Sequence, residues 1–122
     1  MKIEYAEDVR EIAVKVNEIA NLGLDLTKVE FIRSYGTRSR AIARVLMLPS
    51  QWRFVLKPSV LYIVEVISER YDSLECEQKV EVILHELFHI PKKMSGGLRK
   101  HNFKEFRRVR EEGRKISQKI CL

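Results

Sequence analysis

The sequence predicts an α+β fold with an N-terminal helix, a small and mainly antiparallel sheet of three or four strands, and two further helices. Two observations support this class: apolar residues recur at helical spacing near both ends of the chain, and short β-branched and aromatic runs lie between them. The 122 residues, 45% hydrophobic and 33% charged, suffice for one hydrophobic core. We therefore expect one domain over residues 1–122.

The N-terminal helix is expected from about Glu7 to Leu22, with Gly23 as a natural stop. Its apolar positions follow the three-and-four spacing of one helical face: Val9, Ile12, Ala13, Val16, Ile19 and Ala20.

Strands are expected between residues 29 and 68, where turn-forming residues separate four short apolar runs. These runs are "VEFIRSY", "AIARVLML", "WRFVL" and "LYIVEVIS". The segment "SRAIARVLM" fits a short helix equally well, because its apolar positions do not alternate cleanly.

A buried helix is expected from about Leu74 to Ile90, since Asp72 and Glu75 have the spacing of a capping box and an almost continuous apolar surface follows. Pro91 helps to end this helix, and the glycine-containing segment "KKMSGGLRK" reverses the chain. From His101 onward, an apolar stripe predicts a final helix with a basic outer face.

All three histidines of the chain lie between residues 85 and 101. His85 and His89 are four residues apart, so a helix projects both from the same face, and Glu86 completes an HExxH motif. Two neutral imidazoles suit Zn²⁺, and the glutamate can reach an activated water without being a ligand. A catalytic zinc needs a third protein ligand, for which His101 is the candidate after the reversal.

The spacing of the histidines excludes one known zinc-binding signature, and a glutamate is the less favoured third ligand. Eleven residues separate His89 from His101, whereas the metzincin signature has five at this position. Glu105, one turn after His101, is the less favoured alternative as third ligand or as a group that orients one.

The run "HELFHIP" followed by "GGLRKH", preceded by "YIVEVISERYDSL", resembles the archaeal and phage metallopeptidase family of the zincin superfamily, and is similar to SprT-like minimal zincins. The resemblance covers roughly residues 29–106. It implies a minimal zincin-like fold, with His85, His89 and His101 as metal ligands and Glu86 as the catalytic acid and base.

The expected function is a zinc-dependent metallopeptidase with one Zn²⁺ per chain, which acts on protein or peptide substrates. The alternative is a zincin-like zinc-binding module without turnover. We take "LYIVEVIS" as the candidate edge strand for substrate, with a plain core strand as the equal alternative. Tyr62, Tyr71 and Arg99 could each stabilise an oxyanion, but no motif singles one out.

Positive charge is concentrated at the C-terminus: residues 1–91 have 12 basic and 14 acidic side chains, and residues 92–122 have 11 and 3. Such a helix face is usually solvated surface, but it could bind nucleic acid without sequence preference. Its members are Lys104, Arg107, Arg108, Arg114, Lys115 and Lys119.

No signal peptide or membrane segment is evident, so we expect a soluble cytoplasmic protein that has no contact with a membrane. Cys76 and Cys121 lie outside any CxxC pair. We expect two free thiols, with a disulfide between them as the alternative.

Overall fold

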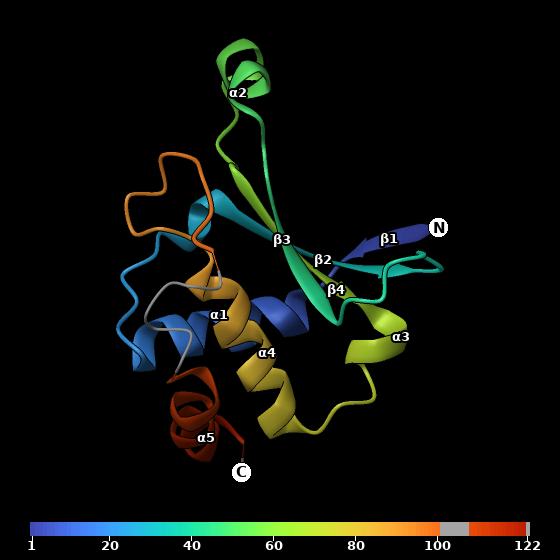
Figure 1. The fold of residues 1–122 in the computed structure, drawn as a ribbon, viewed down its shortest axis with the longest axis vertical. Coiled ribbons are helices and arrows are strands. Elements are labelled where there is room, and N and C mark those ends of the chain that lie inside the picture. The colour runs from blue at the N-terminus through green and yellow to red at the C-terminus, as the bar shows by residue number, and fades with distance from the viewer. Residues whose placement is uncertain (101–107, 122) are drawn as a thin grey trace.

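A computed structural model describes residues 1–100 and 108–121 of the chain. The expected α+β class is confirmed, in an arrangement compatible with a minimal zincin-like fold. Helices α1 (Glu7–Ile19), α4 (Cys76–Phe88) and α5 (Val109–Ile120) gather on one side of a four-stranded sheet (Figure 1).

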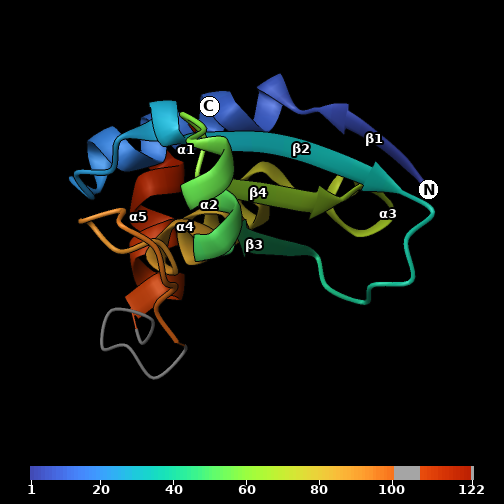
Figure 2. The same ribbon diagram turned by 90° about the horizontal axis from the view of Figure 1, so that it is seen from above.

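The sheet has the order β1-β2-β4-β3. Strand β2 (Val29–Tyr35) pairs in parallel with β4 (Tyr62–Ile67), while β1 (Lys2–Tyr5) and β3 (Ala43–Met47) add to its two sides as antiparallel edges. The sheet is therefore mixed, with two antiparallel pairings and one central parallel pairing. Figure 2 shows the strands as one layer, with α2 at the end where β3 finishes and β4 begins.

The core lies between one sheet face and the helices α1 and α4. Alternate residues of the two central strands point into it, among them Phe31, Tyr62 and Val64, and all three are buried. Helices α1 and α4 pack side by side, with α1 also against β2 and α4 against β3. Because strand residues alternate between faces, Ile3, Tyr5 and Leu46 lie on the opposite face, where they are exposed.

The structure differs from the sequence expectation after Pro49 and at the N-terminus. The run "WRFVL" belongs to helix α2 (Ser50–Leu56), not to a strand. This helix projects from the body (Figure 1), and no strand of the described residues pairs with it. Local bonds such as Arg53 N–H to the Pro49 carbonyl oxygen satisfy its backbone instead. The four-residue strand β1 was not expected, and the ambiguous segment before Leu48 forms strand β3.

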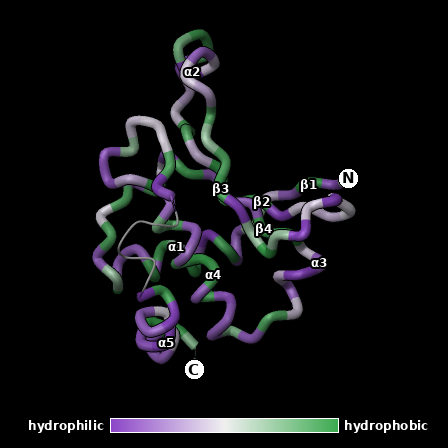
Figure 3. Tube along the Cα trace, viewed as in Figure 1, coloured by the Kyte–Doolittle hydropathy of each residue, from purple (hydrophilic) through white to green (hydrophobic). Residues whose placement is uncertain are grey.

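Helix α2 exposes an apolar surface, which Figure 3 shows as hydrophobic colour near its tip. The exposed fractions are 57% for Trp52, 79% for Phe54, 70% for Val55 and 58% for Leu56.

The expected capping box is displaced by one turn. Glu75 caps helix α4 with Gln78 as its partner, so the helix begins at Cys76. Asp72 instead ends the short helix α3 (Ser68–Tyr71), where it accepts hydrogen bonds from Arg33 and Ser68. The N-terminal helix also ends sooner than expected, at Ile19, because Asn21 adopts a left-handed backbone conformation before Gly23.

The two cysteines form a disulfide, so the expectation of free thiols was wrong. Cys76 begins helix α4 and Cys121 follows α5, and their Cα atoms are 5.9 Å apart. The antiparallel packing of α5 along α4 brings these positions together, which a separation of 45 residues does not reveal. None of the described helices is long and apolar enough to cross a membrane.

Candidate metal centre

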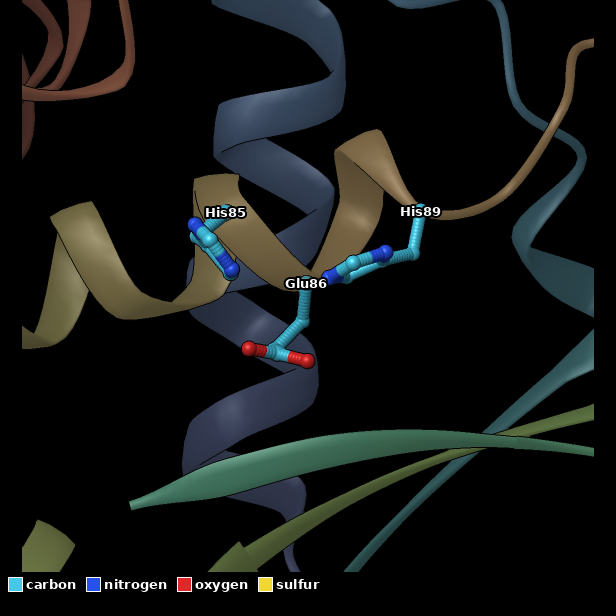
Figure 4. A group of neighbouring side chains, drawn as sticks. All are labelled: His85, Glu86 and His89. Atoms are coloured by element: carbon cyan, nitrogen blue, oxygen red, sulfur yellow. The ribbon is translucent and has the colours of Figure 1, made fainter. Parts of the chain in front are cut away.

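Helix α4 presents two different faces to its surroundings. Val80, Ile83, Leu84 and Leu87 are fully buried in the core, which fixes the rotation of the helix about its axis. With that face held, His85, Glu86 and His89 lie on the side toward strand β3 (Figure 4). The HExxH spacing thus brings these three side chains together, on a helix that packing orients.

The two imidazoles and the carboxylate form one compact group. Their potential ligand atoms all lie within 4.8 Å of one another, and the two imidazole centroids are 5.1 Å apart. Figure 4 shows each imidazole turning a nitrogen toward the space between the rings, while the Glu86 carboxylate extends toward β3. This donor set of two nitrogens beside a carboxylate can hold a divalent metal ion.

His89 is oriented by the chain that returns after the reversal. Its Nδ1 lies 2.7 Å from the Arg99 carbonyl oxygen, and the Arg99 N–H donates to the His89 carbonyl oxygen at 2.6 Å. Because a carbonyl can only accept, Nδ1 must carry the proton, which leaves the Nε2 lone pair for a metal. No sequence motif signals this interaction, because it depends on the path of a loop.

Glu86 is only 7% exposed, and burial raises its pKa to about 7. A carboxylate removed from water prefers to be protonated unless a cation stabilises its charge. The two neighbouring imidazoles offer nitrogen donors that could hold such a cation at this point. The donor set and the buried carboxylate together therefore fit a bound cation.

The loop between α4 and Lys100 is held at several points by the sheet and α2. Tyr62 Oη accepts from the Gly96 N–H at 3.1 Å and donates to the Gly97 carbonyl oxygen at 3.2 Å. Arg53 Nη1 donates to the Ser95 carbonyl oxygen at 2.8 Å. This loop ends at Arg99, so its anchors also set the position of the carbonyl that orients His89.

Hollows lined by residues of α4 and β3 lie beside the candidate metal ligands. One, of about 260 Å³, is lined by His85, Glu86 and His89 of α4 together with residues of β3 and Leu98. Sequence reasoning did not assign β3 to the site, because its segment was ambiguous between helix and strand. Of the two equal interpretations of residues 61–68, the edge strand for substrate was wrong and the core strand is confirmed, since β4 lies between β2 and β3.

Several predicted residues lie outside the described part of the chain: His101, Glu105, Lys104 and Arg107. Of the three oxyanion candidates, Tyr62 anchors the loop and Arg99 orients His89 through its backbone. Tyr71 is fully buried, and its pKa is raised chiefly by that burial.

The basic face of α5 is partly neutralised by acidic neighbours. Figure 3 shows hydrophilic colour over this helix. Arg114 Nε lies 3.9 Å from Glu77 Oε1 on helix α4, and Lys115 Nζ lies 3.7 Å from Glu111 Oε1. Arg108 and Lys119 are exposed.

Comparison with protein families gives a match over nearly the whole chain. The family described as "Putative phage metallopeptidase" matches residues 1–120. No curated protein and no solved structure matches the chain.

Proposed function

Since the chain belongs to the family described as putative phage metallopeptidase, we propose that it is a zinc-dependent peptidase that hydrolyses peptide bonds in protein or peptide substrates. In this proposal residues 1–122 form a single zincin-like domain. His85, His89 and His101 hold one Zn²⁺, and Glu86 is the general base. The observation that carries the proposal is the buried Glu86 carboxylate beside two imidazoles whose potential ligand atoms lie within 4.8 Å.

Zinc is the metal that best suits this donor set. Imidazole nitrogens are borderline ligands that favour Zn²⁺ over the oxygen-seeking Mg²⁺ and Ca²⁺. When bound, the ion supplies Lewis-acid chemistry, which lowers the pKa of water and polarises a carbonyl oxygen.

His101 is supported as the third ligand by the reach of the chain. It follows Arg99 by two residues, and two residues span at most about 7 Å. The Arg99 carbonyl oxygen is hydrogen-bonded to His89. The two residues that lead to His101 therefore begin beside a candidate metal ligand. No other histidine remains in the chain to complete the set.

Glu86 has the position and basicity for proton transfer. Its carboxylate accepts a proton from the attacking water as the oxygen bonds to the scissile carbonyl carbon, and then delivers that proton to the leaving nitrogen. The products are a carboxylic acid and an amine, so no co-reactant other than water is needed. Burial raises the pKa of the metal-free carboxyl to about 7, and a bound cation would favour the ionised form that accepts the proton.

Strand β3 is the best candidate for binding the substrate backbone. It ends the strand order, so one of its edges has no partner strand among residues 1–100 and 108–121. Ala43 and Val45 line the hollow that also contains Glu86 and His89. An extended peptide added to this edge would present its carbonyl groups to Glu86.

The decisive experiment compares the wild type with Glu86→Gln, which keeps the shape of the side chain and removes its basicity. The variant should retain zinc while cleavage of an unfolded protein or mixed peptides falls by roughly 100-fold or more. Glu77→Gln on the same helix, at a side chain that is 57% exposed, provides the control and should cleave as the wild type does.

The alternative, a zinc-binding module without turnover, makes a different prediction: zinc is bound, but wild type and Glu86→Gln show equal trace cleavage or none. Equal and substantial cleavage by the two proteins would show that hydrolysis does not take place at this site.

A further inference from the structure

A second hollow, of about 450 Å³, extends from the candidate metal centre toward the beginning of helix α4. It shares His85 and Glu86 with the smaller hollow, so its inner end lies at the reacting groups. Residues from β3, α4 and α5 line it, and its size is within the usual range for ligand-binding pockets. A substrate held along β3 would therefore place a side chain into it next to the scissile bond.

Apolar side chains form part of the wall of this hollow, beside Gln78 and the charged residues that line it. Ile42 precedes β3, Leu74 precedes α4, Val82 lies on α4, and Val109 begins α5. Apolar side chains can pack around a methylene stem, but they form no hydrogen bond or ion pair with a polar group at its end.

Glu81 supplies an acidic group to the same hollow, and helix packing fixes its stem. A Cβ added to Gly113 of α5 would lie 3.3 Å from Glu81 Cα and Cβ and 3.4 Å from Cγ. The absence of a side chain at Gly113 thus lets α5 approach the base of Glu81. The stem of Glu81 is thus packed against α5, and its side chain, 36% exposed, lines the hollow.

Arg110 is the basic residue that lines the hollow, and it is loosely placed. Its Nε lies 3.9 Å from Glu81 Oε1, and its side chain is 85% exposed, compared with 36% for Glu81. Such an exposed ion pair contributes little to stability, so a substrate cation can replace it.

We propose that this hollow is a substrate subsite for a lysine or arginine side chain flanking the scissile bond, with Glu81 as the specificity-determining residue. The methylene stem packs on the apolar side chains of the wall, and the cationic tip meets the Glu81 carboxylate. This inference rests on the proposed peptidase function, because it assigns the residue next to the bond that is cleaved.

Matched peptides test the subsite. Two peptides are compared that differ only in one residue flanking the scissile bond: lysine in one, and norleucine, which has a similar stem without the charge, in the other. We expect wild-type kcat/KM to favour the lysine peptide by about 10-fold or more, and Glu81→Gln to abolish most of that preference.

Glu77→Gln is the matched control, because Glu77 lies one turn earlier on α4, carries the same charge and does not line the hollow. It should leave the preference unchanged. Equal cleavage of the two peptides by the wild type, or a lysine preference that survives Glu81→Gln, would overturn the proposal.

Binding separates this inference from the proposed hydrolysis. Fluorescence anisotropy of the labelled peptides is measured on Glu86→Gln and on the double variant Glu81→Gln/Glu86→Gln, each loaded with zinc. Tighter binding of the lysine peptide that depends on Glu81 supports the subsite even if no cleavage occurs. Cleavage without any preference and without Glu81-dependent binding removes the subsite and leaves the hydrolase standing.

Discussion

His89 and Arg99 are joined by two hydrogen bonds, one between backbone groups at 2.6 Å and one from the His89 imidazole to the Arg99 carbonyl oxygen at 2.7 Å. The pair closes the loop that follows helix α4. This pairing therefore sets the tautomer of a candidate ligand and also fixes where the chain begins its approach to His101.

Zinc content should depend on all three histidines. Protein purified without added metal should contain one Zn²⁺ per chain. His101→Ala should weaken zinc affinity by roughly 100-fold or more, because the proposed three-ligand site would keep only two ligands. Elemental analysis and competition with a chromogenic chelator measure both quantities. Lys100→Ala, at the exposed neighbouring position, is the control and should bind zinc normally. Zinc affinity unaffected by His101→Ala would remove His101 from the site.

The stability of the metal-free protein should decrease as pH rises because of Glu86. Burial raises its pKa from 4.5 to about 7, so the native state binds the proton more tightly than the unfolded state does. The stability contribution of the protonated group is fully present below pH 4.5 and is lost as pH rises through 7. Relative to Glu86→Gln, the wild type should lose about 2–3 kcal/mol of unfolding free energy between pH 5 and pH 8.

Urea unfolding in the presence of a chelator measures this difference at each pH. Saturating zinc should reduce it, because a cation favours the ionised carboxylate. Parallel pH profiles for the two metal-free proteins would contradict the assigned burial of Glu86.

Reduction of the disulfide should destabilise the protein. The Cys76–Cys121 bond has a sequence separation of 45 residues, and closing a loop of that size stabilises by about 4 kcal/mol in the chain-entropy model. The free energy of unfolding should therefore fall by about 2–4 kcal/mol in dithiothreitol. The Cys76→Ser/Cys121→Ser variant should match the reduced protein and should not respond to reductant. Thiol titration of the purified protein gives the fraction that is oxidised, and two reactive thiols under oxidising conditions would disprove the pairing.

Gly96 should tolerate alanine poorly, and Arg53 should account for part of the penalty. A Cβ at Gly96 would lie 2.6 Å from Arg53 Nη2, whereas a Cβ at Gly97 would meet nothing within 4 Å. Both glycines have positive φ, so both substitutions incur backbone strain of about 1–3 kcal/mol. Only Gly96→Ala should lose part of its penalty in an Arg53→Ala background, as a double-mutant cycle of unfolding free energies would show. Additive penalties would indicate that the guanidinium moves aside freely.

DNA binding through the basic face should depend steeply on salt if that face binds phosphates. Removing one side chain that binds a phosphate lowers the slope of log affinity against log salt by about 1. Replacing Arg107, Arg108 and Arg114 by Gln should flatten the slope in fluorescence anisotropy. Because Arg114 already lies near Glu77, we expect its contribution to be the smallest of the three. No binding at low salt would leave the face as ordinary solvated surface.

The sequence by itself determined the parts of this protein that depend on local spacing. The helical repeat places His85, Glu86 and His89 near one another however the helix packs. The HExxH motif can therefore be recognised from the sequence, with no knowledge of tertiary contacts. The apolar stripes of α1 and α4 also depend only on local spacing. Both helices were predicted correctly, with errors of at most three residues at their ends.

Tertiary structure decided what depends on contacts between distant residues. The position of β4 inside the sheet and of β3 at its edge follows from pairing, and a strand's composition does not state which neighbours it has. The run "WRFVL" became a helix because no strand lies beside it, and the cysteines meet because α5 packs along α4. The bonds between His89 and Arg99 and the hollow beside Glu81 arise in the same way, since each needs elements whose approach only the folded chain defines.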